Sequence, residues 1–212
     1  MTVMYSFVLQ LRETLPTGVF TDTEVVSLLE GTANRRYGLI KRALAHGDLI
    51  QLRRGVYGLG KKFQRTPLNH FEVAQKIYSP SYVSLESALS YHGWIPEAVY
   101  TTTNVSLKRS ATFNTPVGDF SYTRIPKFNF IGVERVCDGN TIYLIANPTK
   151  ALADYIIANK MALAPKKLMG FLRIEGESWG KLSYKLFNEI TEGYRSTRLR
   201  VFLRELRKSG PL

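Results

Sequence analysis

The sequence is poor in the residues that stabilise secreted and metal-binding proteins. It has one cysteine, Cys137, in 212 residues, which excludes an internal disulfide and a zinc finger built on cysteine ligands. Acidic residues are also scarce, with 17 aspartates and glutamates against 29 lysines and arginines, so the formal net charge is +12. We therefore expect a protein of the reducing cytoplasm with a polyanionic partner.

Long hydrophobic runs are missing as well. No segment approaches the roughly 18 uncharged apolar residues of a membrane helix, and residues 1–15 have no basic residue before their apolar part, unlike a signal peptide. Hydrophobic residues still make up 44% of the chain and aromatic residues 12%, which is enough for a packed core. We expect a soluble, folded protein without membrane contact, built as one large domain or two small ones.

The positive charge is concentrated at the two ends of the chain. Residues 1–66 carry ten basic and five acidic side chains, residues 67–150 carry seven and six, and residues 151–212 carry twelve and six. Because the middle third is nearly neutral, contacts with a polyanion are expected at the two ends.

The first 66 residues have the pattern of three helices. Apolar residues recur at helical spacing over residues 5–15. Thr21, followed three residues later by Glu24, has the sequence signature of a capping box and predicts a second helix through about residue 29. After a short turn that contains glycine, Thr32 is a suitable N-cap for a third helix through about residue 46.

A β-hairpin is predicted directly after the third helix. Two apolar segments, residues 49–52 and 56–59, flank Arg53-Arg54-Gly55, and glycine suits the tight turn between them. Helix, helix, turn, helix and hairpin is the order typical of a winged helix-turn-helix. We predict such a DNA-binding domain over residues 1–66, with a basic linker at residues 61–67.

The rest of the chain, residues 67–212, is predicted to form an α+β C-terminal domain. Helical periodicity over residues 68–78 is followed by a short strand and by a helix that Ser84 caps. Alternating β-branched and aromatic residues between Ala98 and Tyr143 predict an antiparallel sheet. Asn147-Pro148 opens another helix, and the chain from Lys166 has a helical pattern with a break around residues 175–177 and a basic final helix.

The third helix separates into an apolar and a polar face on a helical wheel. The apolar face consists of Tyr37, Leu39, Ile40, Ala43 and Leu44. The polar face consists of Asn34, Arg35, Gly38, Lys41, Arg42 and Ala45. Arginine can bind guanine with two hydrogen bonds and asparagine can bind adenine in the same way, while small residues let the helix approach the groove wall.

These residues and the hairpin turn give a set of predicted DNA contacts. The set is Thr32, Asn34, Arg35, Arg36, Gly38, Lys41, Arg42, Arg53 and Arg54. Arg36 falls on the apolar side, so either it contacts a phosphate from the first turn or it is structural. Arg53 and Arg54 lie at the turn of the hairpin, where a wing reaches phosphate or the minor groove. The competing interpretation is an ordinary solvated helix face.

A second basic run lies near the C-terminus. It contains Arg195, Arg198, Arg200, Arg204, Arg207 and Lys208, with only Glu205 opposing. An apolar stripe at Leu199, Phe202, Leu203 and Leu206 predicts that this helix docks on the body and presents its arginines outward. We predict additional phosphate contacts by Arg195, Arg198, Arg200, Arg204 and Arg207. The alternative is a solvated helix end whose cations complement the helix dipole.

Features of an enzyme or a metal site are weak in this sequence. The three histidines, His46, His70 and His92, lack metal-ligand spacing, and no glycine-rich phosphate-binding loop is present. Ser84 lacks the small-residue elbow of a hydrolase nucleophile. Glu175 and Glu177 flank a glycine and fit solvated loop charges. We therefore expect a protein that is not an enzyme and has no cofactor and no metal.

Three segments resemble a known family. They are Arg54-Gly55-Val56-Tyr57, residues 80–89 (Pro-Ser-Tyr-Val-Ser-Leu-Glu-Ser-Ala-Leu) with His92-Gly93, and Lys150-Ala151-Leu152-Ala153-Asp154 after Asn147-Pro148. Over roughly residues 5–157 the chain resembles the AbiEi-type antitoxins of bacterial abortive-infection systems, which are type IV toxin-antitoxin systems of phage defence. Residues 82–89 are the most specific part of the resemblance, and we interpret them as core of the C-terminal domain rather than as a binding site.

The resemblance implies a transcriptional autorepressor whose winged helix binds inverted repeats in its own promoter. It also implies a nucleotidyltransferase-like toxin as functional partner, countered through the C-terminal domain without a need for direct contact. Two protomers are expected on half-sites about one helical turn apart. The alternatives are an RNA-binding module that uses its basic ends on structured RNA, and a nuclease or nucleotidyltransferase, which would need a metal-binding carboxylate cluster.

Overall fold

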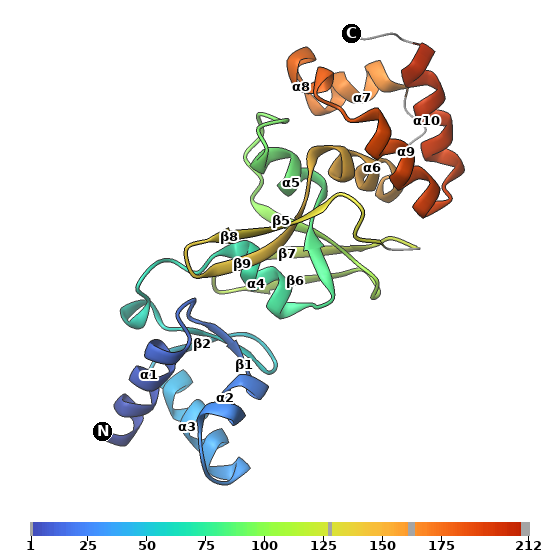
Figure 1. The fold of residues 1–212 in the computed structure, drawn as a ribbon. Coiled ribbons are helices and arrows are strands. Elements are labelled where there is room, and N and C mark those ends of the chain that lie inside the picture. Colours follow the sequence, from blue (N-terminus) through green and yellow to red (C-terminus); the bar gives the residue numbers. More distant parts are fainter. Residues whose placement is uncertain (1, 127–128, 161–163, 209–212) are drawn as a thin grey trace.

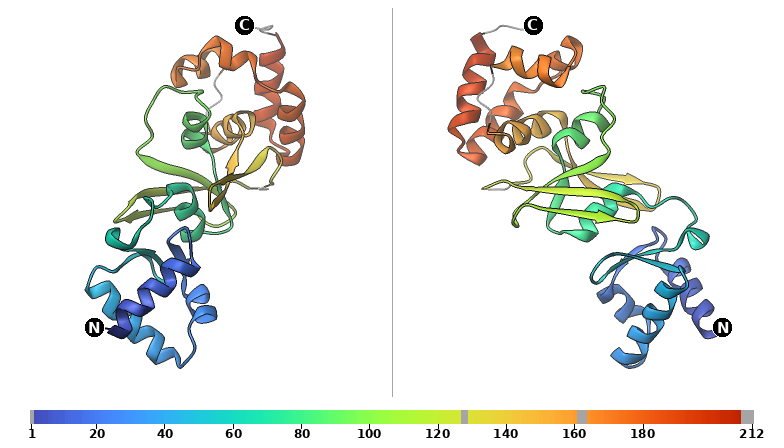
Figure 2. Two further views of the ribbon diagram at one scale, coloured as in Figure 1. Left: turned by 60° about the vertical axis from the view of Figure 1, so that its left-hand side comes forward. Right: turned by 180° about the vertical axis from the view of Figure 1, so that it is seen from behind.

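A computed structural model describes residues 2–126, 129–160 and 164–208. Helices and two β-sheets make the protein a mixed α+β structure, as predicted. Figure 1 shows an elongated arrangement with an N-terminal unit at one end, a six-stranded sheet in the middle and a group of C-terminal helices at the other end. The two further views in Figure 2 show the same order of layers.

The N-terminal unit, residues 2–59, contains three helices and a three-stranded sheet. Its elements are α1 (Thr2–Thr14), β1 (Val19–Thr21), α2 (Asp22–Leu28), α3 (Ala33–Ala45), β2 (Leu49–Arg53) and β3 (Val56–Leu59). The sheet is antiparallel, with strand order β1-β3-β2. The three predicted helices and the hairpin are confirmed. Strand β1 was not predicted, because three residues carry too little periodicity to be read from the sequence.

Local capping explains where α2 and α3 begin. The backbone N–H of Thr21 donates to Glu24 Oε2 at 2.7 Å, and the hydroxyl of Thr21 accepts from the N–H of Glu24, which confirms the capping box. The hydroxyl of Thr32 accepts from the N–H of Arg35 at 3.3 Å. Each cap satisfies a backbone donor that has no partner within its own helix.

The core of the N-terminal unit confirms most of the predicted apolar face of α3. Leu39, Ile40 and Ala43 are buried against residues of α1 and the sheet, and Leu44 is partly buried. Tyr37 was predicted on this face but is 67% exposed. On the helical wheel Tyr37 lies next to Leu44 at the edge of the apolar arc, where a side chain does not pack into the core.

The outer face of the three-stranded sheet packs on the next part of the chain. A cluster of buried residues joins the strands to helix α4 (His70–Ile77) and to the central sheet, and it contains Val19, Leu52, Val56, Leu68, Val73, Ala74, Ile77, Phe120 and Tyr122. The predicted linker begins with a 3₁₀ turn, η1 (Lys61–Phe63), whose Phe63 is buried in the N-terminal core. This connection is therefore packed against both of its neighbours.

The central sheet has six strands in the order β6-β7-β5-β4-β9-β8. They are β4 (Ser81–Val83), β5 (Thr101–Ser106), β6 (Ala111–Thr115), β7 (Gly118–Arg124), β8 (Val133–Asp138) and β9 (Thr141–Ala146). The prediction of an antiparallel sheet is only partly right: β4–β5, β6–β7 and β8–β9 are antiparallel, but β5 pairs with β7 and β4 with β9 in parallel. Turn residues identify only strands joined by a hairpin, β6–β7 and β8–β9, and carry no information on pairs that form after a crossover.

Helices α5 (Leu85–Tyr91) and α6 (Pro148–Ala158) lie against the side of the sheet that faces away from the N-terminal unit (Figure 1). Four more helices pack beyond them among the described residues: α7 (Pro165–Leu172), α8 (Gly176–Gly180), α9 (Tyr184–Tyr194) and α10 (Thr197–Lys208). The break predicted around residues 175–177 is misplaced, because α8 begins at Gly176. The chain instead turns at Arg173 and Arg195, both in the left-handed conformation with φ of 51° and 50°.

Candidate nucleic-acid interface

Helix α3 lies at the free end of the N-terminal unit. Its buried face is held by Leu39, Ile40 and Ala43, so the opposite face is directed away from the core. Figure 1 shows α3 at the end of the molecule farthest from the C-terminal helices. The structure therefore presents one side of this helix to solvent along its whole length.

The exposed side of α3 carries cations that have no acidic partner. Asn34, Arg35, Lys41 and Arg42 are exposed, and Gly38 between them is partly exposed. Among the residues that the structure describes, no carboxylate forms an ion pair with Arg35, Lys41 or Arg42. Their charges are neutralised only by solvent ions, which a polyanion can displace. We call these five residues the α3 face.

Arg36 was predicted either to contact a phosphate or to be structural, and in the structure its side chain makes structural contacts. Its guanidinium donates to the carbonyl oxygen of Gly31 at 2.5 Å and to that of Leu29 at 3.4 Å. Both acceptors belong to the turn between α2 and α3, where Gly31 has φ of +114°, a conformation that glycine adopts without strain. Arg36 thus ties α3 to the turn that follows the preceding helix.

The two hairpin arginines, both predicted to reach a ligand, have different environments. Arg53 Nη1 donates to the carbonyl oxygen of Ile77 at 2.6 Å, and its guanidinium carbon lies 4.7 Å from the ring centroid of Phe113. Arg53 is therefore a contact between the N-terminal unit and the central part of the molecule. Arg54 is exposed and has no such partner among the described residues.

The hairpin turn itself is anchored to the start of α2. Gly55 has φ of +77°, and a Cβ atom there would lie 2.9 Å from Asp22 Oδ2, so this position requires glycine for two reasons. The carbonyl oxygen of Gly55 also accepts from the N–H of Asp22 at 3.0 Å. These contacts fix the place of Arg54 relative to α2 and α3.

A hollow of about 400 Å³ separates α2, α3 and the hairpin turn. It is lined by Asp22, Val25, Val26, Ala33, Arg36, Tyr37, Ile40, Gln51, Arg54, Gly55 and Tyr57. Two of these residues are exposed side chains that a ligand can contact: the aromatic ring of Tyr37 and the guanidinium of Arg54. Sequence analysis missed Tyr37 as a surface residue, and its position at the edge of the apolar arc was the only available signal.

The C-terminal arginines lie on α10 and on the turn before it. The predicted apolar stripe is confirmed, with Leu199, Phe202, Leu203 and Leu206 all buried. Arg200 forms an ion pair with Glu192 at 3.2 Å, an opposing acid that sequence analysis did not identify because it lies on α9. Lys208 pairs with Glu205 at 2.9 Å. Arg195, Arg204 and Arg207 are exposed, and Arg198 is partly buried.

A buried cluster of charged and hydroxyl side chains lies between strand β4 and helices α6 and α9. Lys150 and Asp154, one turn apart on α6, have fully buried side chains and an Nζ–Oδ1 distance of 3.5 Å. Tyr194 donates to Asp154 Oδ1 at 2.5 Å, while Tyr82 and Ser84 each donate to Asp154 Oδ2 at 2.8 Å. We call these five residues the Lys150 cluster. Ser84 occupies the N-cap position of α5, but its side chain makes no capping bond, so its predicted role is wrong.

Lys150 has hydrogen-bond acceptors both inside this cluster and next to it. Its Nζ donates to Tyr194 Oη at 2.5 Å and to Asn129 Oδ1 at 3.1 Å, and it lies 4.0 Å from the ring centroid of Tyr194. Burial lowers the pKa of Lys150, and the charge of Asp154 opposes that shift. Burial also raises the pKa of Tyr82 and Tyr194. With no access to solvent, the cluster is an architectural element that joins β4, α6 and α9.

Two of the segments that carry the family resemblance meet in this cluster. Residues 80–89 supply Tyr82 and Ser84, and residues 150–154 supply Lys150 and Asp154. Most of the side chains of the first segment, from Tyr82 to Leu89, are buried. The interpretation of this segment as core is confirmed, and the tyrosine and serine are explained by the need of Asp154 for donors.

Metal binding and membrane insertion are not visible in the described part of the chain. Within residues 2–126, 129–160 and 164–208, no three histidine, cysteine, aspartate or glutamate side chains lie close enough together to hold a metal ion. Over the same ranges, none of the helices combines the length and the apolar character needed to cross a membrane.

No protein-family model matches this chain, and no curated protein matches it. The resemblance to AbiEi-type antitoxins therefore stays a prediction that rests on the three quoted segments and on how the structure uses them.

Proposed function

We propose that the protein is a DNA-binding transcriptional repressor with an N-terminal winged helix-turn-helix. The order α1-β1-α2-α3-β2-β3, with its antiparallel β1-β3-β2 sheet, supports this class. The observation that carries the proposal is the α3 face, where three exposed cations and an amide lie on one side of a helix without acidic partners. In such a domain α3 enters the major groove.

The spacing on α3 is suited to reading several base pairs. Arg35 and Arg42 are seven residues apart, which is about 10.5 Å along a helix. That length corresponds to about three base-pair steps of 3.4 Å. Each guanidinium can donate to O6 and N7 of a guanine, and the amide of Asn34 can bind an adenine. Because Gly38 between them has no side chain, the backbone at the centre of the helix can approach the bases closely.

The remaining contacts of this interface go to the DNA backbone. Lys41 at the edge of the α3 face and Arg54 beside the hollow are placed for phosphates on either side of the groove. The hydroxyl of Thr32 lies at the N-terminus of α3, where backbone N–H groups favour an anion. Arg36 and Arg53 stabilise the domain and make no contact with DNA.

The finer proposal follows from the resemblance to AbiEi-type antitoxins. The protein binds inverted repeats in its own promoter as two protomers and counters a nucleotidyltransferase-like toxin of a phage-defence system. It acts by binding and performs no catalysis. The way in which the Lys150 cluster uses two of the three quoted segments supports the proposal that this chain shares the C-terminal fold of that family.

The test is fluorescence anisotropy with the DNA upstream of the gene and a shuffled duplex of equal length, at two salt concentrations. Phosphate contacts weaken as salt rises, whereas base contacts keep their preference. We expect tighter binding of the upstream duplex at both concentrations, lost in Arg42→Gln and kept in the matched variant Lys166→Gln on α7. Equal, salt-sensitive binding of both duplexes would contradict the proposal and favour the RNA-binding alternative.

A further inference from the structure

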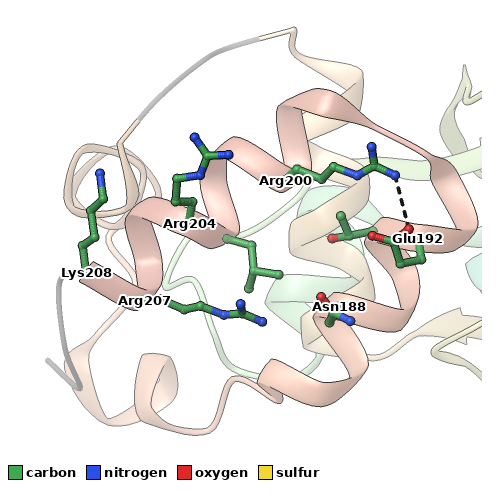
Figure 3. Close-up of a pocket in the computed structure, with 8 residues that line it drawn as sticks. Asn188, Glu192, Arg200, Arg204, Arg207 and Lys208 are labelled. Atoms are coloured by element: carbon green, nitrogen blue, oxygen red, sulfur yellow. Dashed lines mark hydrogen bonds and ion pairs between the residues drawn. The ribbon is translucent and has the colours of Figure 1, made fainter.

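A groove between α9 and α10 lies at the opposite end of the molecule from α3. It encloses about 430 Å³ and is lined by Asn188, Thr191, Glu192, Arg200, Leu203, Arg204, Arg207 and Lys208. Figure 3 shows the two helices side by side, with arginines of α10 on one wall and Asn188 and Glu192 of α9 on the other. We call this the α9–α10 groove.

The groove is strongly cationic because its charges are only partly neutralised. Four lining residues are basic and one, Glu192, is acidic. Glu192 pairs with Arg200 at 3.2 Å, which occupies that guanidinium. Arg204 and Arg207 are exposed and form no ion pair with any residue that the structure describes. Figure 3 shows the guanidinium of Arg207 extending toward Asn188.

The lining favours a phosphodiester backbone over a protein segment. Leu203 is the single apolar residue among the eight, so the groove has no cluster of apolar side chains that could enclose an anchoring side chain of an acidic peptide. Guanidinium groups bind phosphate with paired hydrogen bonds. The amide of Asn188 and the hydroxyl of Thr191 add neutral donors and acceptors for a sugar hydroxyl or a phosphate oxygen.

The size and place of the groove favour a single strand. A duplex presents its phosphates on a convex cylinder about 20 Å wide, whose major groove alone is about 12 Å, so only a single strand can enter a hollow of this volume. Figures 1 and 2 place α9 and α10, whose residues line the groove, at the opposite end of the molecule from α3, so one straight duplex on α3 does not reach it. None of the eight described residues that line the groove is aromatic, so binding through them is independent of base stacking.

We propose that the α9–α10 groove binds the phosphate backbone of single-stranded nucleic acid through Arg204 and Arg207, without sequence preference. The protein then holds two nucleic acids at once, a duplex on α3 and a strand in the groove. Of the predicted C-terminal contacts, this proposal selects Arg204 and Arg207 because they are exposed, unpaired and in the groove, whereas Arg195 and Arg198 lie outside the lining.

The test uses the full-length protein and labelled mixed-sequence strands of about 12 nucleotides, a length within the range that single-strand sites cover. RNA and DNA of the same sequence form the two arms, and affinity is measured by anisotropy over a series of salt concentrations. In Arg204→Gln/Arg207→Gln we expect binding about tenfold weaker and a salt slope smaller by about 1.4, because each lost phosphate contact removes about 0.7.

Matched variants distinguish binding in the groove from non-specific attraction to the positive charge of the protein. Lys166→Gln/Lys167→Gln removes two exposed charges of α7 outside the groove, so its strand binding should match the wild type within about twofold. Arg204→Lys/Arg207→Lys should keep the salt slope and lose part of the affinity. Tighter binding of RNA than of DNA would assign a sugar contact to Asn188 or Thr191, and equal binding would assign the backbone alone.

Three outcomes overturn the proposal. They are an unchanged slope in the double glutamine variant, an equal loss in the α7 variant, and displacement of the strand by an acidic peptide at equal charge concentration. The loss caused by Arg204→Gln/Arg207→Gln should be the same in the wild-type and the Arg42→Gln background. Because this difference does not depend on α3, failure of duplex recognition and failure of the groove are distinguishable. Equal thermal unfolding of all variants shows that each one is folded.

Discussion

The α3 face and the Lys150 cluster are built from similar residue types but have opposite environments. On α3, arginine and lysine are exposed and lack carboxylate partners. In the Lys150 cluster, a lysine and an aspartate are fully buried, and tyrosine and serine hydroxyls complete their hydrogen bonds. Charge in this protein is therefore available to a ligand where it is unpaired and exposed, and it holds the fold where it is paired and buried.

The energetic consequences of losing a charge differ accordingly. A hydrated cation at the surface contributes little to folding, so its removal changes stability by less than about 0.5 kcal/mol. A buried charge that loses its partner keeps its full desolvation cost. Mutations at both sites can therefore test this difference. Those of the Lys150 cluster should have the largest effects on stability.

The largest effect is expected for Asp154→Asn. This change keeps the size of the side chain but leaves Lys150 without its carboxylate, and Tyr82, Tyr194 and Ser84 without a charged acceptor. Unfolding in urea should show a loss of about 3–5 kcal/mol. As control, Glu177→Gln breaks an exposed ion pair with Lys181, which solvent screens, and should leave the urea midpoint close to that of the wild type. Equal costs would refute the distinction between the two kinds of charge.

Arg35→Ala and Arg42→Ala should each weaken binding of the upstream duplex by about 1–3 kcal/mol and relax its sequence preference. Neither side chain has a partner in the described structure, so the free energy of unfolding should stay within about 0.5 kcal/mol of the wild type. Anisotropy titrations and urea unfolding measure the two quantities. A loss of stability without a loss of DNA binding would show that these arginines stabilise the fold and do not contact DNA.

The two hairpin arginines allow the same comparison between neighbouring residues. Arg54→Ala should reduce the slope of log affinity against log salt by about 0.9 for duplex DNA, one phosphate contact, and leave stability unchanged. Arg53→Ala should leave the slope unchanged and lower stability by about 1–2 kcal/mol, because it removes a charged hydrogen bond to Ile77. The reverse pattern would show that the hairpin turns Arg53 toward DNA.

The smallest effect concerns Glu24, which joins α2 to Lys76 of α4 at 2.5 Å. Burial raises its pKa, but the hydrogen bonds from Lys76 and Thr21 outweigh burial and hold the pKa of Glu24 below its ordinary value of 4.5. The ionised form therefore stabilises the fold above that pH, and the contribution disappears as pH falls through the lowered pKa. The stability difference between wild type and Glu24→Gln should shrink between neutral pH and pH of about 3. A difference that stays constant over this range would show that Glu24 does not titrate with folding.

Local signals in the sequence were sufficient for much of the fold and for part of the candidate interface. Thr21 with Glu24 and the capping residue Thr32 located α2 and α3, and the glycine of the hairpin turn located β2 and β3. The periodicity of α3 placed Arg35 and Arg42 on its exposed side. All of these features depend on residues within one or two turns of each other, so their spacing is visible in the chain.

Contacts between distant segments could not be predicted in this way. The parallel pairs β5–β7 and β4–β9 join strands separated by a crossover, and no turn marks them. The orientation of Arg53 depends on the carbonyl of Ile77, 24 residues later in the chain. The pairing of Arg200 with Glu192 needs α9 and α10 to fold back on each other.

The sequence by itself determined the α+β class, the helix caps and the cationic side of α3, because hydrogen-bonding propensity and apolar spacing act over short distances. Only the tertiary structure decided which charges remain available to a ligand. Arg36, Arg53 and Lys150 are held by packing and hydrogen bonds, while Arg42 and Arg207 are left free among the described residues. That choice depends on which carbonyls, rings and carboxylates the folded chain brings beside each cation, and spacing along the chain does not encode it.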